Sequence, residues 1–390
     1  MPSAIPKTLP ADLIYVSDTL PGISRVLQRE HFHFRDAKGN WLTDREDILR
    51  ISRLAIPPAY TDVWICPLVN GHLQATGRDA RGRKQYRYHA DWSEQRGESK
   101  FDRMEAFGEA LPRIRARVAR DLAPGKGQLL SRARLLATLV RLLDTTFLRV
   151  GNDEYSRING SYGLTTLRNR HAGVRGSVLR LRFRGKSGIM QSVEFDDPKI
   201  AAVVRRCQQL PGQELFQYVD DDGQPHTLGS GDVNDYIAAI SAGRSARSQE
   251  MRFTAKDFRT RHGTVQALEL TRIACTGQAP DQPGYSARSV LAEVARLLGN
   301  TPAVCRKSYI HPAVMALGAS LVNDDEFQQA LWRKLDAGSR PARVYAAEGR
   351  LLAFLKDRRR ALKRGASAQQ RGGKAGSTGN PSRRSLPTPL

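Results

Sequence analysis

The sequence predicts an α+β protein with a small β-rich N-terminal domain, a larger and mainly helical domain, and a basic tail. In the first part, short apolar stretches are separated by turn signals, as in strands joined by tight turns. In the middle part, apolar residues recur at helical spacing. The end is strongly basic and rich in Gly, Ser and Pro. We therefore expect domains at 1–91 and 92–345 and a disordered tail at 346–390.

Composition favours a polyanionic partner. The chain has 390 residues and a formal net charge of +23, and its 40% hydrophobic content is enough for two domains with a core. No apolar run is long enough to span a membrane, and the N-terminus lacks a signal-type hydrophobic region, so nucleic acid is expected rather than a membrane. The cysteines are scattered, which predicts neither a metal site nor disulfides and fits a reducing cytoplasm. They are Cys66, Cys207, Cys275 and Cys305.

The N-terminal domain ends in a strand that interleaves cations with aromatic residues. Turns are expected at Lys38-Gly39-Asn40, Asn70-Gly71 and Arg81-Gly82, and the strand follows the last of them. Such a pattern suits contact with phosphates and base edges, although a solvated basic edge strand is the plainer alternative. The candidate DNA-binding residues here are Arg83, Lys84, Gln85, Tyr86, Arg87, Tyr88 and His89.

Two helices are predicted to open the larger domain. Apolar residues recur on one face over 101–114 and again over 135–147. The second stripe is followed directly by Arg149, which would emerge from a rigid support. A solvated helix cap is the simpler interpretation of this arginine when it is taken alone.

The clearest strand signal is a hairpin with Lys186 at its tip. Apolar residues alternate with arginines over 179–184, a glycine-bounded turn follows at 185–188, and the alternation resumes over 189–195. A nucleotide-binding P-loop is rejected because Arg180 occupies the position of its first glycine.

An acidic stretch further along, 220–223, resembles a calcium loop. Gly229 stands where that loop needs a bidentate Glu, and Tyr218 stands where it needs its first ligand. We therefore expect a simple acidic turn.

A dense basic segment, 251–264, leads into an apolar helix and contains Lys256 and Arg259. Further on, Gly299 is expected to cap one helix, and Thr301 and Pro302 to begin the next. That second helix would carry Tyr309, the candidate nucleophile. The plainer alternative for an isolated tyrosine near a helix end is a packing role.

The tail is defined by its cations. From Arg358 onward it has nine Lys or Arg and no Asp or Glu. We expect it to be disordered and to bind DNA without sequence preference.

A set of phosphate-directed donors with one oxygen nucleophile suits phosphoryl transfer without metal. The set consists of Arg149, Lys186, Arg259, Asn300 and Tyr309. With these residues the sequence resembles a type IB DNA topoisomerase of the poxvirus-like bacterial group, from residue 12 to about residue 340. The resemblance rests on the order and spacing of RKQYRYH at 83–89, FLRVGN at 147–152, GLTTLRNRH at 163–171, GK at 185–186, KDFRT at 256–260, and GNTP at 299–302 with Tyr309 nine residues after Asn300.

The resemblance implies a tyrosine recombinase/topoisomerase IB fold in the larger domain, and a monomer whose two lobes close as a clamp around duplex DNA. It also implies a chemical cycle. Tyr309 attacks a backbone phosphorus to leave a 3′-phosphotyrosyl link, and the strand rejoins after rotation releases supercoils. Arg149 and Arg259 clamp the phosphate, Lys186 is the general acid, and Asn300 stands where many relatives carry histidine. Neither ATP, a metal nor another cofactor is expected, and the enzyme would act on the nucleoid in the cytoplasm. Further DNA contacts are expected at Arg168, Arg170, His171, Lys256, Arg306 and Lys307.

Two alternatives remain at this stage. A tyrosine recombinase resembles the same family, but recombinases typically place His three residues before the second catalytic Arg, where this chain has Lys256. A noncatalytic architectural protein would need only the charge. It would leave the five polar residues unexplained, and a gel shift without a covalent adduct would support it.

Overall fold

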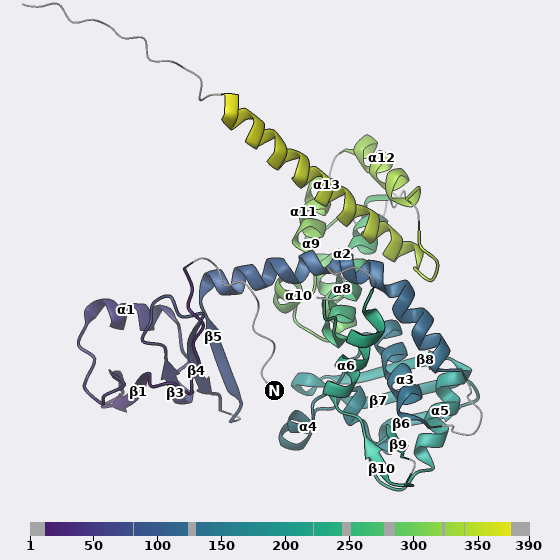
Figure 1. Ribbon diagram of the computed structural model, residues 1–390, viewed down its shortest axis with the longest axis horizontal. Helices are drawn as coiled ribbons and strands as arrows, with labels where there is room; N and C mark the ends of the chain where they lie inside the picture. The colour runs from purple at the N-terminus through teal and green to yellow at the C-terminus, as the bar shows by residue number, and fades with distance from the viewer. Residues whose placement is uncertain are drawn as a thin grey trace, which may run out of the picture. The chain divides into compact units, whose positions relative to one another are not determined.

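The computed structural model describes residues 12–80, 82–123, 130–220, 222–243, 251–276, 285–321, 324–338 and 340–375. The chain divides into two compact units, Met1–Asp102 and Arg103–Leu390. Figure 1 shows a strand-rich first unit and a mainly helical second one, which confirms the predicted α+β class. Two predicted features, Arg81 of one turn and the last residues of the tail, 376–390, lie outside the described residues.

The first unit is built on one antiparallel sheet of strand order β2-β1-β3-β4-β5. Ile23, Ile51, Ile65 and Ala75 are buried together between the sheet and helix α1. The basic and aromatic stretch forms strand β5, as the sequence predicted, and β5 is an edge strand of the sheet. The elements are β1 (Ile23–Gln28), β2 (His31–Arg35), α1 (Arg45–Arg53), β3 (Thr61–Ile65), β4 (Leu73–Arg78) and β5 (Lys84–Tyr88).

The boundary between the units falls later than predicted. Helix α2 (Ala90–Asp121) begins near the expected position but runs on, and the chain divides after Asp102 rather than after residue 91. The reason is Trp92, which is buried with its ring edge against His72 at 5.0 Å. The start of α2 therefore packs as part of the first unit.

The core of the second unit joins helices to a small sheet. Strands β6, β7 and β8 pair as an antiparallel sheet, and Leu179, Leu181 and Phe183 of β7 are buried with Leu139 and Ile200 from the helices α3 and α5. This confirms the predicted hairpin. The elements here are α3 (Arg132–Thr145), α4 (Asp153–Asn159), β6 (Ala172–Arg175), β7 (Val178–Arg184), β8 (Met190–Asp196), α5 (Pro198–Gln208), β9 (Gln217–Val219), β10 (Pro225–Thr227) and α6 (Ser230–Ser241).

The remaining helices surround α8. Gly299 takes a left-handed conformation (φ 56°) at the end of α9, and the Thr301 hydroxyl accepts from the Val304 N–H to start α10, as predicted. Tyr309, however, lies just beyond α10 rather than within it. The helices are α8 (Ala255–Thr276), α9 (Ala287–Leu298), α10 (Pro302–Ser308), α11 (Pro312–Ser320) and α12 (Asp325–Asp336).

The prediction of a disordered tail from residue 346 is wrong for its first part. Residues Ala346–Ala375 form helix α13, and Leu351, Leu352 and Leu355 are buried. Their spacing places three apolar side chains on one face of a helix, which packs against the rest of the unit.

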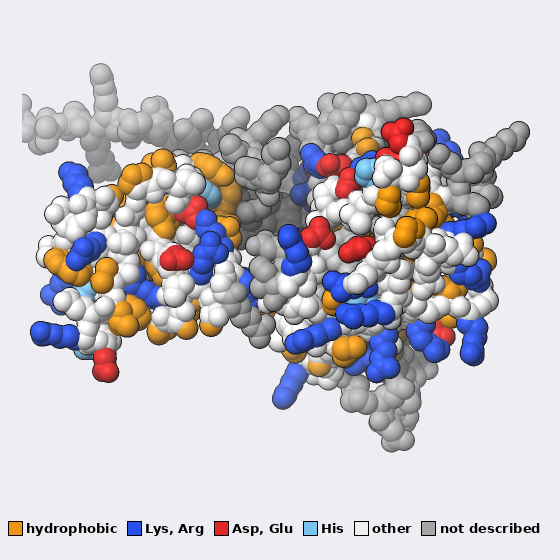
Figure 2. All heavy atoms as spheres, turned by 90° about the horizontal axis from the view of Figure 1, so that it is seen from below, with side chains coloured by type: hydrophobic (Ala, Val, Ile, Leu, Met, Phe, Trp, Pro, Cys, Tyr) orange, Lys and Arg blue, Asp and Glu red, His pale blue; other side chains and the backbone are white. Residues whose placement is uncertain are grey.

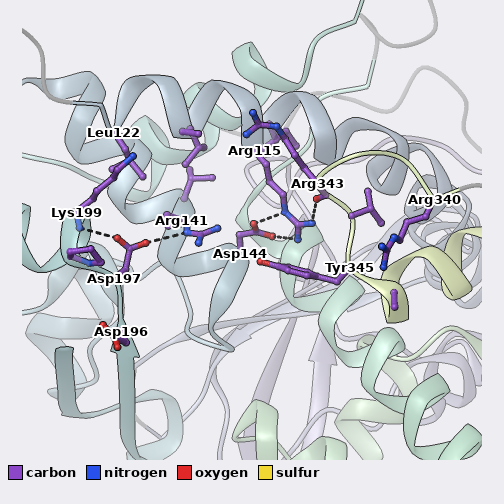
Figure 3. A pocket seen from close by; sticks show the side chains of 17 residues that line it. Arg115, Leu122, Arg141, Asp144, Asp196, Asp197, Lys199, Arg340, Arg343 and Tyr345 are labelled. Atoms are coloured by element: carbon purple, nitrogen blue, oxygen red, sulfur yellow. Dashed lines mark hydrogen bonds and ion pairs between the residues drawn. The ribbon is translucent and has the colours of Figure 1, made fainter. Parts of the chain in front are cut away.

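A buried ion network fixes the start of α13. Arg115 donates to both carboxylate oxygens of Asp144 (2.7 and 2.8 Å) and to both of Glu348 (2.7 and 2.8 Å), thereby joining α2, α3 and α13. Figure 3 shows Arg115 beside Asp144, with the Tyr345 ring close by. Arg115 also donates to the Arg343 carbonyl. Because every charge in the network has a partner, α13 is held as a structural element rather than as a free tail.

Candidate active site

Arg149 is placed by a tight backbone crossing that follows α3. The Arg149 carbonyl accepts a hydrogen bond from the Leu164 N–H (2.9 Å). A side chain on Gly163 would put its Cβ 2.5 Å from Gly151 Cα, so only glycine allows the two segments to pack this closely. Gly151 also has a φ of +111°, which other residues rarely adopt. The backbone at Arg149 is therefore fixed before any substrate arrives.

Arg259 is held from two sides on helix α8. Its guanidinium donates to the Leu298 carbonyl (2.8 Å) at the end of α9 and to the Phe147 carbonyl near Arg149. The side chain is buried, with 4% of its surface exposed. Both contacts use backbone carbonyls, so they orient the guanidinium without neutralising its charge.

Asn300 is oriented by Arg149. Arg149 Nη2 donates to Asn300 Oδ1 at 2.6 Å. An arginine has only donors, so this contact fixes the amide with its oxygen toward Arg149 and its NH₂ group away from it. That Nδ2 atom is buried and has no hydrogen-bond partner among the described residues. It is therefore available to donate to a bound group.

Tyr309 lies close to both arginines. The Arg259 Cζ atom is 5.3 Å from the centre of the Tyr309 ring. Burial opposes ionisation of the phenol, but the charges of Arg259 and Arg149 outweigh it, so the pKa of Tyr309 lies below its ordinary value. This is the shift that an attacking phenolate needs.

Among the described residues, the two arginines have no carboxylate partner. Neither Arg149 nor Arg259 forms an ion pair with any of the residues that the structure describes, although both are largely buried. Burial, and after it the charge of Arg149, lowers the pKa of Arg259 to about 10. The Nε atom of Arg259 is also buried and has no hydrogen-bond partner among the described residues. Two buried cations without an anion are costly, and a phosphate between them would relieve that cost.

Lys186 lies outside this cluster. It is exposed at the hairpin tip, where Ser187 and Gly188 have positive φ angles and the Gly185 N–H donates to the Ile189 carbonyl (2.8 Å). The hairpin does approach the cluster close to its turn, because a Cβ on Gly299 would lie 2.8 Å from Nε2 of Gln191, the second residue of β8. The structure thus brings together four of the five predicted residues and leaves Lys186 apart.

The predicted DNA contacts of the second unit differ in how exposed they are. Lys256 is exposed in the first turn of α8 and contributes to the lowered pKa of Tyr309. Arg306 and Lys307 are exposed in the last turn of α10.

The 168–171 segment is more tightly packed. Arg168 donates to Gln213 and lies 5.7 Å from the centre of the Tyr162 ring, and the His171 ring packs against the same tyrosine at 4.5 Å. Burial, and after it the neighbouring Arg170 and Arg168 charges, lowers the pKa of His171. Arg170 itself is exposed.

In the first unit, strand β5 presents a pair of aromatic rings. Tyr86 and Tyr88 are stacked with ring centres 6.0 Å apart, and both are more than a third exposed. Lys84 pairs with Asp18. Figure 2 shows Lys and Arg side chains on the surface of each unit.

The other predicted contacts of this strand are held locally. Arg83 pairs with Asp79 (2.6 Å), and the Gln85 amide donates to the same carboxylate (2.9 Å). Arg87 donates to the Ala55 carbonyl (3.1 Å), and the His89 ring accepts from the Asp91 N–H (3.3 Å). Tyr86 and Tyr88 are nevertheless exposed on this strand, at 48% and 40% of their surface.

The sequence did not predict the residues of α8 that pack against the backbone of Tyr309. A Cβ on Gly263 would lie 2.8 Å from the Tyr309 carbonyl oxygen, and the Thr264 hydroxyl is 3.0 Å from that same oxygen. The pattern Arg259, Gly263 at i and i+4 was a usable signal, since it places both on one face of α8. Glu348 was missed too, because it lies in a stretch that was assigned to the tail.

No group of three or more His, Cys, Asp or Glu that could hold a metal ion occurs in the ranges that the structure describes. In those same ranges no helix is long and apolar enough to cross a membrane.

Comparison with known proteins gives two family matches and one curated relative. Residues 89–333 match the family described as eukaryotic DNA topoisomerase I, catalytic core, and residues 31–79 match bacterial DNA topoisomerase IB, N-terminal domain. The chain is 29% identical to a DNA topoisomerase 1B of Acanthamoeba polyphaga mimivirus over 298 residues, which are 75% of this chain and 85% of the relative.

Among solved structures, the chain is similar to a XerH site-specific recombinase bound to its difH substrate in a pre-cleavage complex. The TM-score is 0.31 and the identity 12%, over 55% of this chain and 53% of that chain. The chain thus spans about half the length of that structure.

The catalytic-core match covers more than half of the chain and includes all of the clustered residues. It defines the protein as a DNA topoisomerase. More narrowly, the chain belongs to the type IB DNA topoisomerase family, and its second unit has the fold of that family's catalytic domain.

Proposed function

We propose that this enzyme relaxes supercoiled duplex DNA by cutting one strand through Tyr309 and then resealing it. The Tyr309 phenolate attacks a backbone phosphorus, the bond from phosphorus to the 5′-oxygen breaks, and a 3′-phosphotyrosyl link remains. The departing oxygen takes up one proton and becomes a free 5′-hydroxyl. After the broken strand has rotated, the reverse steps restore the phosphodiester and release Tyr309.

The observation that carries this proposal is a pair of largely buried arginines, without a carboxylate partner among the described residues, beside a tyrosine of lowered pKa. A free tyrosine has a pKa of about 10, so forming its phenolate at pH 7 costs about 4 kcal/mol. The two guanidinium groups offset part of that cost. They would also hold the non-bridging oxygens and favour the charge that builds up in the transition state.

Asn300 and Lys186 would complete the chemistry. The partnerless Asn300 Nδ2 can donate to a phosphate oxygen, but an amide does not titrate near neutral pH, so its role is positioning. Lys186 would protonate the departing 5′-oxygen, which an arginine could not do, since it scarcely gives up its proton. Its exposed place on a hairpin tip requires that bound DNA bring the scissile phosphate and the lysine together.

The covalent link preserves the energy of the broken phosphodiester, so the cycle would need neither ATP nor a metal. Stacked Tyr86 and Tyr88 offer the first unit a means of gripping the duplex, so we propose a monomer that closes on DNA with both units. Such an enzyme would work on the nucleoid in the cytoplasm.

Relaxation of a supercoiled plasmid in EDTA and without ATP tests the proposal. We expect complete relaxation by the native protein and none by Tyr309→Phe, which loses only the attacking oxygen and should still bind DNA. Relaxation that depends on ATP or on a divalent cation would refute the proposal, as would relaxation by the Tyr309→Phe variant.

A further inference from the structure

Tyr309 follows a helix of only seven residues, so the helix alone cannot fix it. The N–H groups of Tyr309 and Ile310 both donate to the Cys305 carbonyl (2.9 and 3.1 Å), which ends α10 in a turn. Beyond that turn the Tyr309 carbonyl and the His311 N–H point away from α10, and their partners come from another element. A chain segment that carries a nucleophile must be fixed more firmly than this turn alone provides.

Helix α8 supplies the missing contacts through Thr264. The buried Thr264 hydroxyl oxygen accepts a hydrogen bond from the His311 N–H (3.0 Å) and lies 3.0 Å from the Tyr309 carbonyl oxygen. The hydroxyl has one proton, which it can donate either to that carbonyl or to the Thr260 carbonyl at 3.0 Å. One side chain therefore holds the backbone on both sides of Ile310.

Gly263 allows this close approach. A Cβ at Gly263 would lie 2.8 Å from the Tyr309 carbonyl oxygen and 3.1 Å from the Tyr309 Cβ. Arg259 lies one helical turn earlier on the same face of α8, with its guanidinium over the Tyr309 ring. Helix α8 thus places the Arg259 guanidinium over the Tyr309 ring, and at Gly263 it has no side chain that would collide with the Tyr309 backbone. Figure 1 shows α8 and α10 within this unit.

We propose that Gly263 and Thr264 are positioning residues that seat the Tyr309–His311 backbone on α8, so that one rigid helix sets both the nucleophile and the Arg259 clamp. This inference rests on the proposed role of Tyr309 as nucleophile. Without the seat, the phenol would sample positions away from the phosphate that Arg259 holds, and both cleavage and resealing would slow.

The test compares two threonines of α8 that differ only in this contact. Thr264 and Thr271 are both buried, and each hydroxyl can donate to the carbonyl four residues earlier. We expect Thr264→Val to lower the single-turnover cleavage rate at saturating enzyme by at least about 10-fold, since small misplacements of reacting groups have effects of this size. Thr264→Ser should restore most of the rate, and Thr271→Val should leave it unchanged.

A second readout separates positioning from general loosening of the fold. The cations that lower the pKa of Tyr309 act less strongly as the phenol moves away from them. Thr264→Val should therefore move the rise of cleavage rate with pH to higher pH, whereas Thr271→Val should not. The rates are compared well below the melting transition of every variant, with noncovalent DNA binding measured in parallel.

Gly263→Ala provides an independent variant. Alanine favours a helix more than glycine does, so slower cleavage by this variant reports the collision with Tyr309 rather than a weakened helix. Native cleavage rates in both Thr264→Val and Gly263→Ala would overturn the inference, and so would equal losses in Thr264→Val and Thr271→Val. Neither result would affect the proposed function, which fails only if the native protein forms no adduct that depends on Tyr309.

Discussion

The tyrosine cluster and the hairpin tip differ in how far each is built before DNA binds. Arg149, Arg259 and Asn300 are held by backbone carbonyls and by each other, and they lie close to Tyr309 within one unit. Lys186 is exposed, and in the part of the chain that the structure describes its turn is held by the hydrogen bonds that the Gly185 N–H donates to Ile189 and the Gly188 N–H donates to Gly185. The groups that recognise phosphate are thus in place beforehand, whereas the proposed proton donor is not.

We interpret this difference as a division of labour. Preorganised donors lower the free energy of the transition state because they need no rearrangement during the reaction. A general acid that stays apart until DNA is bound cannot protonate or shield the phenol in the free enzyme. Substitutions in the two regions should therefore have separate effects, and the largest is expected at the hairpin.

Removing the hairpin lysine should have the largest effect on chemistry. Lys186→Ala should slow cleavage by about 100-fold to 10,000-fold, the usual contribution of a general acid. Single-turnover cleavage of a short duplex measures this rate. A 5′-phosphorothiolate at the scissile bond, whose sulfur leaves without protonation, should rescue the variant. Failure of the sulfur substrate to rescue it would assign Lys186 to binding instead.

Removing a preassembled cation should have a smaller effect on rate and a distinctive effect on pH dependence. Arg259→Ala should slow cleavage by about 100-fold to 1,000-fold, as expected for one transition-state donor. Because the Arg259 charge lowers the pKa of Tyr309, its loss raises that pKa, so the rate should rise at a higher pH than in the native enzyme. Arg259→Lys keeps a cation and should show a smaller displacement. An unchanged pH profile in Arg259→Ala would argue against phenolate stabilisation by this residue.

Breaking the buried ion network around Arg115 should change the stability of the fold rather than the cleavage rate. Glu348→Ala leaves Arg115 and Arg261 without one of their carboxylates and should lower the free energy of unfolding by about 3–5 kcal/mol, as for other buried pairs that lose one partner. Urea unfolding measures this loss. Glu293→Ala, which breaks an exposed pair with Arg296, serves as the control and should be nearly neutral. A neutral Glu348→Ala would mean that α13 is not anchored as the structure shows.

The mildest expected change comes from the end of the chain. Residues 365–390 carry four cations, at Arg371, Lys374, Arg383 and Arg384. If these bind DNA only through phosphates, deleting them should flatten the slope of log affinity against log salt by up to about 0.9 for each phosphate that the shortened protein no longer binds. The single-turnover cleavage rate at saturating enzyme should not change. A slower cleavage step would mean that this segment reaches the active site.

The sequence could predict features that depend on neighbouring residues. Gly299 and Thr301 cap their helices as expected because capping is decided within a few residues. The hairpin around Lys186 was readable for the same reason, since its alternation and its glycines are local. The sequence predicted that Tyr309 follows the helix start at Thr301, but it placed Tyr309 within α10 rather than just beyond it. The end of α10 depends on how this segment packs against α8.

Features that depend on contacts between distant segments could not be predicted. Thr264 meets Tyr309 across 45 positions of sequence, and nothing in its surroundings marks it. In the sequence, Glu348 is a single acid next to a basic tail. Its arginine partners come from other helices, so the local sequence does not show them. The apolar spacing of Leu351, Leu352 and Leu355 was a local signal for α13, and the high charge of the tail obscured it.

The most direct test of the central claim is to identify the covalent adduct. A duplex whose cleaved strand releases a short end will trap the intermediate, and proteolysis with mass spectrometry then locates the linked residue. We predict a single DNA-linked peptide joined through Tyr309 to a 3′-phosphate, a free 5′-hydroxyl on the other end, and no adduct with Tyr309→Phe. An adduct on another residue, a link to a 5′-phosphate, or an adduct formed by Tyr309→Phe would contradict the account.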